Sequence, residues 1–256
     1  MKLSEKTILI TGASAGIGRC VAEKLAAGNN NVVITARRAA QLEDVASIVR
    51  ARGSRCLVLP ADALDEAATQ AVVDRAVNEF GRMDAVLLNI GEGPAYNMAT
   101  ASAATIKRCM HINYDVTVNY LVPTIACMKA AGGGLIAHTN SLAGLLGVPM
   151  QGPYSAAKSA CRLLLDTSRT ELKRFNIRIA SVYPGFIATE RTADDGIPAP
   201  FEISPDACAE HILRAMERET PDTLFPWQTS LMTRVLQNLP KSWAGNLMLK
   251  AAAAEY

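Results

Sequence analysis

The sequence has little net charge and no long apolar segment. Lys and Arg number 26 and Asp and Glu 24, and this formal net charge of +2 does not suit a general nucleic-acid-binding protein. No apolar run approaches the roughly 18 residues that span a bilayer. The apolar stretch Ile8–Ile10 ends at once in Thr11 and Gly12, which does not fit a secretory signal. We therefore expect a soluble, cytoplasmic protein with no nucleic-acid partner.

The cysteine and histidine spacings are not those of a disulfide framework or a metal site. The chain has 6 cysteines and no CxxC pair, a pattern typical of reduced core thiols in a cytosolic protein. The 3 histidines, at positions 111, 138 and 211, lack metal-ligand spacing. We expect reduced thiols and no bound metal.

Hydrophobic residues make up 50% of the chain and charged residues 20%, enough for a large core and too apolar for a disordered protein. Short runs of Val, Ile and Leu alternate with longer helical patterns. Because these runs are almost continuously apolar, they indicate parallel strands that are covered on both faces. The alternation predicts an α/β fold, a doubly wound parallel sheet with helices on both faces. The predicted strands are Thr7–Thr11, Asn31–Ala36, Arg55–Pro60, Asp84–Asn89, Leu135–Thr139 and Arg178–Tyr183, and the predicted helices are Arg19–Ala27, Ala39–Arg52, Glu66–Phe80, Thr105–Ala131 and Tyr154–Phe175.

A glycine-rich turn follows the first predicted strand, with Gly12, Gly16 and Gly18 directly before a helical pattern. Glycines at such a turn allow a tight bend, a close approach of a pyrophosphate and close packing of helix on sheet. The start of the helix then offers unpaired N–H groups and a positive dipole end to an anion. This position in the first strand–helix turn predicts a Rossmann-type, dinucleotide-binding domain.

The spacing of this turn is GxxxGxG, preceded by Thr11, and not the commoner GxGxxG. In this the sequence resembles the short-chain dehydrogenase/reductase family. The resemblance extends over about residues 5–190 and implies an oxidoreductase that uses a nicotinamide cofactor. It also implies a homodimer or homotetramer, with the predicted helices Thr105–Ala131 and Tyr154–Phe175 packed across the interface.

The end of the second predicted strand indicates which nicotinamide cofactor is bound. An acidic residue about 20 residues past the glycines commonly holds the adenine ribose hydroxyls of NAD. Here Ala36 takes that place, and Arg37 and Arg38 follow it. A guanidinium can bind a 2′-phosphate through two hydrogen bonds. We expect NADP(H) as the cofactor, with Arg37 as the phosphate contact and Arg38 beside it.

The resemblance implies further cofactor contacts along the chain. Leu88-Asn89-Ile90-Gly91 matches the family motif NNAG only at Asn89 and Gly91, since Leu88 replaces the first Asn. A second match, to PGxxxT, borders the nicotinamide in the family. The positions assigned to the cofactor besides the three glycines and the two arginines are Ser14, Ile17, Asp62, Asn89, Gly91, Tyr154, Lys158, Pro184, Gly185, Ile187 and Thr189.

Tyr154 and Lys158 match the YxxxK motif of the family, and their spacing places both side chains on one helix face. An ammonium beside a tyrosine stabilises its phenolate, the form that accepts a proton. By resemblance, Ser141 polarises the substrate oxygen and Asn113 supports a proton relay from Lys158. The catalytic set that the resemblance implies is Asn113, Ser141, Tyr154 and Lys158.

The apolar residues that precede Tyr154 indicate a hydrophobic substrate. We expect Leu142, Leu145, Gln151, Tyr154 and Phe186 to line the substrate pocket. The substrate would be a small-molecule ketone, aldehyde or secondary alcohol. A non-catalytic NADP(H)-binding regulator is the alternative from another class, but it would not need the proton-transfer groups.

We expect one domain over residues 1–256, with a lid over about residues 188–203 and a C-terminal extension over about residues 224–256. Between Pro184 and Pro205 the chain is rich in proline, which suits a lid. Ser204 and Pro205 form a helix start for a helix that runs to about Glu219. The extension carries an apolar stripe with basic residues nearby. Two interpretations stay open for it. In the first, the extension covers the pocket or forms a subunit interface. In the second, it is a helix that lies on a membrane, as part of a lipid or steroid reductase.

Overall fold

A computed structural model describes residues 1–188 and 199–251, and its centre is a seven-stranded sheet. The strand order is β3-β2-β1-β4-β5-β6-β7, and every neighbouring pair is parallel. The predicted doubly wound parallel sheet is therefore confirmed. The strands are β1 (Thr7–Thr11), β2 (Asn31–Ala36), β3 (Arg55–Pro60), β4 (Ala85–Leu88), β5 (Gly134–Thr139), β6 (Ile177–Pro184) and β7 (Asp222–Phe225).

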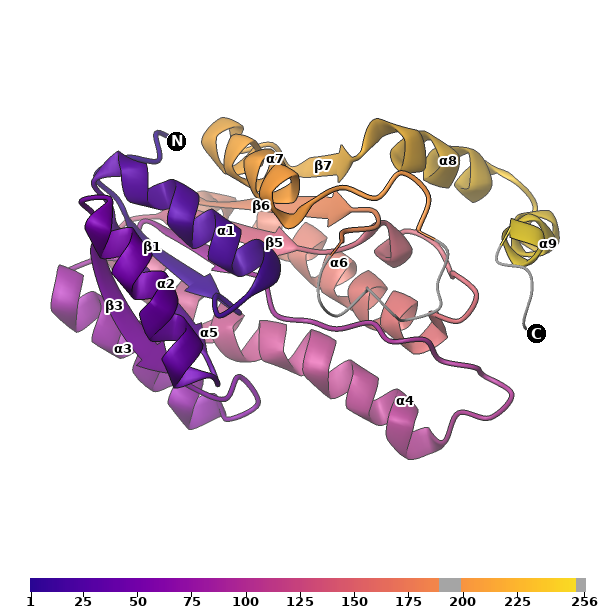
Figure 1. The fold of residues 1–256 in the computed structure, drawn as a ribbon, viewed down its shortest axis with the longest axis horizontal. Coiled ribbons are helices and arrows are strands. Elements are labelled where there is room, and N and C mark those ends of the chain that lie inside the picture. The colour runs from indigo at the N-terminus through magenta and orange to yellow at the C-terminus, as the bar shows by residue number, and fades with distance from the viewer. Residues whose placement is uncertain (189–198, 252–256) are drawn as a thin grey trace.

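Helices cover both faces of this sheet (Figure 1). Alternate residues of a strand point to opposite faces, so Ile8 and Ile10 pack with α1, α2 and α7, whereas Leu9 packs with α3, α5 and α6. The described helices are α1 (Gly16–Leu25), α2 (Ala39–Ala51), α3 (Glu66–Phe80), α4 (Ala103–Met110), α5 (Val116–Ala130), α6 (Gly152–Leu172), α7 (Pro205–Arg218), α8 (Trp227–Asn238) and α9 (Lys241–Ala251).

Two elements differ from the prediction. The predicted helix Thr105–Ala131 is divided into α4 and α5 by a π-helical turn at His111–Asp115. The short strand β7 was not predicted, because its four residues at the sheet edge are only partly buried and form no continuous apolar run. The predicted start of α7 is confirmed, since the Ser204 hydroxyl accepts a hydrogen bond from the Ala207 amide at 3.1 Å.

The described residues between β6 and α7 make backbone contacts with one another and with β7. Ile187 forms a parallel bridge with Ile203, and the Gly185 amide donates to the Phe225 carbonyl of β7 at 2.8 Å. Most of the predicted lid, residues 189–198, lies outside the described residues. Among residues 1–188 and 199–251, no helix is both long and apolar enough to cross a bilayer.

Strand order reverses on either side of β1, because β2 and β4 are its two neighbours. In an open parallel sheet the ligand crevice lies beyond the carboxyl ends of the strands at such a reversal. The glycine turn follows β1, Asn89 follows β4 and Ser141 follows β5. The topology thus brings the predicted site residues to one edge of the sheet.

Candidate active site

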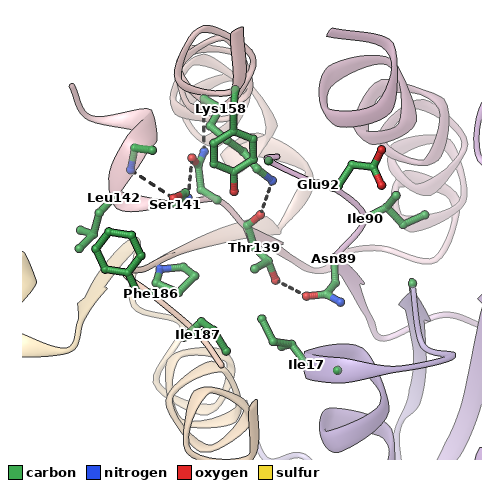
Figure 2. A pocket seen from close by; sticks show the side chains of 18 of the residues that line it. Ile17, Asn89, Ile90, Glu92, Thr139, Ser141, Leu142, Lys158, Phe186 and Ile187 are labelled. Atoms are coloured by element: carbon green, nitrogen blue, oxygen red, sulfur yellow. Dashed lines mark hydrogen bonds between the residues drawn. The ribbon is translucent and has the colours of Figure 1, made fainter. Parts of the chain in front are cut away.

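A cavity of about 1180 Å³ lies beyond the carboxyl ends of β1, β4, β5 and β6 (Figure 2). It is larger than the usual 300–1000 Å³ or so of a small-molecule pocket, so a dinucleotide and a substrate can share it. Most of the predicted site residues line it, namely Gly12, Ser14, Gly16, Ile17, Arg37, Arg38, Asp62, Asn89, Gly91, Ser141, Leu142, Gln151, Tyr154, Lys158, Pro184, Gly185, Phe186 and Ile187. Thr189 lies outside the described residues.

The glycine turn has the backbone that its sequence predicts. Gly12 and Gly16 have φ angles of 67° and 53°, a conformation that side chains disfavour. A Cβ atom at Gly18 would lie 2.4 Å from the Gly12 carbonyl oxygen, so only glycine lets α1 pack this closely. The first turn of α1 has no acidic residue, and Ala15 at its start has no side-chain oxygen to accept from it. The N–H groups there are available to an anion.

Both arginines after β2 line the cavity, but they differ in their contacts. The Arg38 guanidinium donates to the Ser14 hydroxyl in the glycine turn, at 3.0 Å from Nη2 and 3.3 Å from Nε. Sequence reasoning favoured Arg37 over Arg38 and could not detect this contact, because Ser14 and Arg38 are 24 residues apart. The cavity is therefore cationic where β2 ends.

Asn89 and Leu88 show how the incomplete NNAG motif fits. The Asn89 side-chain oxygen accepts a hydrogen bond from the Thr139 hydroxyl at 2.8 Å. The backbone amide of Asn89 donates to Thr11 Oγ1 at 2.8 Å. These bonds join the ends of β1, β4 and β5. Leu88, which replaces the usual Asn, is 2% exposed and packs in the core below α3 and α5. The replacement thus fills an apolar position in the core.

Lys158 is buried beneath the Tyr154 ring. Its side chain is tied to β5, because Nζ donates to the Thr139 carbonyl oxygen at 3.0 Å. The ammonium lies 5.7 Å from the centroid of the Tyr154 ring. Both side chains come from α6, as the i, i+4 spacing predicts.

Asn140 positions the loop that carries Ser141. Its Nδ2 donates to the Lys158 carbonyl oxygen at 3.1 Å, and its Oδ1 accepts from the Ser141 amide at 2.8 Å. The side chain thereby joins the end of β5 to α6. A Cβ atom at Gly144 would lie 2.4 Å from Asn140 Oδ1, so the glycine makes room for this contact. Sequence reasoning missed this role of Asn140.

Asn113 lies in the π-helical turn and is fully buried. Its side chain pairs with the backbone of Glu92, accepting from the Glu92 amide at 3.1 Å and donating to its carbonyl at 2.8 Å. Asn113 does not line the cavity directly, because Gly91 separates them. A Cβ atom at Gly91 would lie 2.6 Å from Asn113 Oδ1 and 3.0 Å from Lys158 Nζ. A π-helical turn commonly marks a functional position in a helix.

Gln151 holds the loop after β4 against the start of α6. Its Nε2 donates to the carbonyl oxygens of Gly93 at 3.0 Å and Pro94 at 3.4 Å. A Cβ atom at Gly93 would lie 2.9 Å from the Tyr154 ring. Gln151 thus lines the pocket as predicted and also packs the loop against Tyr154, a role for which its sequence position held no signal.

The far end of the cavity is mainly apolar, and the C-terminal helices supply part of its wall. Leu142 and Phe186 line it as predicted, as Figure 2 shows. The prediction for Leu145 is wrong, because the cavity lining includes its neighbour Leu146 and not Leu145. The Leu145 carbonyl instead accepts from Gln237 of α8 at 2.9 Å. The wall also contains Met232, Leu236 and Met248, which belong to the C-terminal extension.

Four charged residues that line the cavity were not predicted, namely Arg19, Glu92, Arg108 and Glu202. Arg108 of α4 lines the wall, with Nη2 3.7 Å from a carboxylate oxygen of Glu92. A guanidinium near the apolar end could contact a polar substituent of a substrate. Its sequence position, inside the predicted helix that also carries Asn113, held no signal of this placement.

The chain is a member of the short-chain dehydrogenase family. The family model described as short chain dehydrogenase matches residues 6–197. The chain is 34% identical over 200 residues to a trans-4-hydroxycyclohexanecarboxylate dehydrogenase of Sinomonas cyclohexanicum, covering 75% of this chain and 76% of that protein. It is 28% identical to an uncharacterized oxidoreductase of Myxococcus xanthus, with 93% and 94% covered. A crystal structure of a short-chain type dehydrogenase/reductase from Mycobacterium marinum aligns with a TM-score of 0.80 and 26% identity, over 88% of this chain and 95% of that one.

Gly91→Ala tests how tightly the loop packs on Asn113 and Lys158. The added methyl group has no room, so we expect a loss of about 1–3 kcal/mol in the free energy of unfolding. Urea unfolding measures this loss. Gly147→Ala is the control, because nothing lies within 4 Å of a Cβ atom there. Equal stability of the two variants would contradict the close packing.

His138 should make the stability depend on pH. Burial, and then the charge of Lys158, hold the pKa of His138 well below its ordinary value, and neither ring nitrogen has a hydrogen-bond partner among the described residues. The unfolded chain binds a proton near pH 6.5 that the folded chain does not, so stability is lost as the pH falls below about 6.5.

His138→Asn should reduce this loss. We expect the wild type to lose up to about 1.4 kcal/mol more per pH unit than the variant between pH 6.5 and 5 or so. Urea unfolding at several pH values measures both slopes. Parallel pH profiles would show that His138 is not the titrating group.

Proposed function

We propose that the protein is an NADP(H)-dependent oxidoreductase that transfers hydride between the nicotinamide and the carbonyl or secondary alcohol of a hydrophobic small molecule. The observation that carries this proposal is one cavity that joins Ser141, Tyr154 and Lys158 to the arginines after β2. Proton-transfer groups at one end and cations at the other suit a phosphorylated cofactor and a reacting carbonyl.

The residues present fit such a cofactor. The glycine turn and the first amides of α1 would hold the pyrophosphate, because Gly12, Gly16 and Ile17 line the cavity where α1 begins. Arg37 and Arg38 would hold a 2′-phosphate, and Ala36 supplies no carboxylate to repel it. Asp62, whose Oδ1 accepts from the Leu64 amide at 3.1 Å, lies at the adenine end of the wall.

When bound, the nicotinamide supplies or accepts the hydride. In the reductive direction the Tyr154 hydroxyl donates a proton to the substrate oxygen, and in the oxidative direction its oxygen accepts one. The Ser141 hydroxyl donates a hydrogen bond to the same substrate oxygen and stabilises its developing negative charge. Lys158, held by the Thr139 carbonyl, stabilises the tyrosinate, and Asn113 supports the proton path to solvent.

The apolar wall supports a hydrophobic substrate. Leu142, Phe186 and Met232 contribute to it, and Arg108 adds a polar contact at its side. A relative that is 34% identical is named as a dehydrogenase of a hydroxycyclohexane carboxylate, which is a cyclic secondary alcohol. A non-catalytic NADP(H) sensor is disfavoured, since it would not need Tyr154 and Ser141 beside the cofactor site.

A homodimer or homotetramer forms part of the proposal. Val122 of α5 and Leu163 of α6 are 61% and 57% exposed, although both are large apolar side chains. They lie on the two helices that the family resemblance places at a subunit interface. Burial of such side chains in a partner subunit favours association.

Tyr154→Phe should abolish turnover without loss of cofactor binding. We expect at least a 100-fold lower kcat/KM for any carbonyl that the wild type reduces, because general acid catalysis contributes about 10²–10⁴-fold. NADPH absorbance in a screen of hydrophobic ketones and aldehydes measures the rate. Tyr120→Phe is the control, because its hydroxyl lies 3.1 Å from Thr35 Oγ1 and it does not line the cavity. Near-normal turnover by Tyr154→Phe would refute the assignment.

Arg37→Gln and Arg38→Gln test the choice of cofactor. Each should weaken NADPH binding roughly 10-fold or more and change NADH binding little, because a hydrogen bond to a charged group contributes about 1.5–3 kcal/mol. Fluorescence titration with both cofactors measures the dissociation constants. Arg50→Gln serves as the control, since Arg50 pairs with Glu43 and does not line the cavity. Equal binding of NADH and NADPH by the wild type would overturn the preference.

A further inference from the structure

Exposed apolar side chains gather on α8 and α9. Both tryptophans of the chain lie there, with Trp227 71% exposed and Trp243 65% exposed. We name this surface the C-terminal patch, and its members are Trp227, Leu231, Met232, Val235, Trp243, Leu247 and Leu249. Large apolar side chains are removed from contact with water only when a partner covers them, so an exposed patch of them marks a binding surface. In Figure 1, α8 and α9 lie at the end of the molecule opposite α2 and α3.

Helix α8 buries hydroxyl side chains and exposes large apolar ones, the reverse of the usual amphipathic pattern. The residues that it buries are Thr229, Ser230 and Thr233, whereas Leu231 and Val235 remain more than half exposed. The hydroxyls of Thr229 and Ser230 are satisfied locally by the Pro226 carbonyl, at 3.2 Å and 2.7 Å. A helix whose only task was to cover the pocket would direct its apolar stripe inward. The outward stripe therefore requires a second apolar environment.

The positive charge around the patch indicates which kind of apolar partner would cover it. Arg234, Lys241 and Lys250 lie on the same two helices, and residues 223–251 contain no Asp or Glu. In a symmetric dimer formed through this surface, the patch of one copy would contact the same patch of the other. The cations of both copies would then lie near one another, and residues 223–251 supply no carboxylate to pair with them. An anionic surface with an apolar interior complements both the charge and the exposed side chains.

We propose that the C-terminal patch binds the surface of an anionic lipid bilayer, with α8 and α9 lying in the headgroup region. The two helices have 12 and 11 residues, too short to span a membrane but sufficient to lie along it. Tryptophan side chains favour the membrane–water interface, where one end is apolar and the other contacts water. The basic side chains reach the lipid phosphates.

The C-terminal patch also adjoins the cavity. Met232 is 45% exposed and lines the cavity wall, and Leu236 and Met248 contribute to the same wall. A substrate dissolved in the bilayer would thus meet the apolar end of the pocket, a consequence that rests on the proposed function. Membrane binding itself does not depend on catalysis and can be measured without any substrate.

The two tryptophans report directly on the proposal. The full chain is mixed with vesicles of phosphatidylcholine alone or of phosphatidylcholine with phosphatidylglycerol, and its fluorescence is recorded. We expect a blue shift, quenching by brominated lipid, and co-sedimentation with the phosphatidylglycerol vesicles, all weakened by salt. Vesicles without phosphatidylglycerol should bind the protein much more weakly.

Variants of exposed residues identify the surface. Lys241→Gln and Lys250→Gln should each weaken vesicle binding roughly fivefold, since a basic residue near an anionic surface contributes about 1 kcal/mol. Leu231→Gln with Leu247→Gln should weaken it at least tenfold. The matched control is Met98→Gln, because Met98 is 55% exposed, as Leu231 is, and lies outside the patch and outside the helices of the proposed subunit interface. This variant should bind as the wild type does. Thermal unfolding checks that every variant remains folded.

Three results would overturn the proposal. The first is a wild type that does not co-sediment with phosphatidylglycerol vesicles. The second is self-association in light scattering that the patch variants abolish while vesicle binding is absent, which would assign the surface to a second copy of the chain. The third is undiminished vesicle binding by folded patch variants.

Discussion

The site depends on a buried lysine ammonium that is held in one place. Lys158 is 3% exposed, and its Nζ donates to the backbone carbonyl of Thr139 at the end of β5. A buried charge is costly unless it is hydrogen-bonded, so this bond determines where α6 can lie against the sheet. Once α6 is placed, Tyr154 lies one helical turn away over the same cavity, and Asn140 ties the Ser141 loop to the same helix. The same charge adds to burial in keeping His138 neutral.

The loop after β4 is shaped around this ammonium from the other side. Asn113 pairs with both backbone groups of Glu92, which brings Gly91 between the amide and Lys158 with no room for a side chain. Gln151 then fixes the next two residues of the loop against the start of α6. The π-helical turn at Asn113 interrupts the continuous helix formed by α4 and α5. Such a turn is less stable than a regular α-helix, and a functional role at this position can explain why it is present.

The proposed substrate pocket and the proposed membrane-binding patch both include residues of the C-terminal helices. The inner side of α8 and α9 closes the apolar end of the cavity, while the outer side leaves tryptophans and leucines exposed. A family core over residues 6–197 thus carries a C-terminal segment with its own surface chemistry. In the proposed function, the proton-transfer residues lie at the sheet edge within the family core, and the C-terminal helices add part of the wall that would contact the substrate.

The sequence by itself determined the parallel sheet, the glycine turn and the Tyr154–Lys158 pair, because each is a local pattern. Continuous apolar runs mark buried strands wherever they occur, and an i, i+4 pair shares a helix face whatever surrounds it. Only the tertiary structure decided that Arg38 contacts Ser14, that Asn140 and Gln151 brace the site, and that Leu145 does not line the cavity. It also decided that α8 buries its hydroxyls and exposes its apolar face, against the usual pattern. These features depend on contacts between residues far apart in the chain, and no local pattern specifies such contacts.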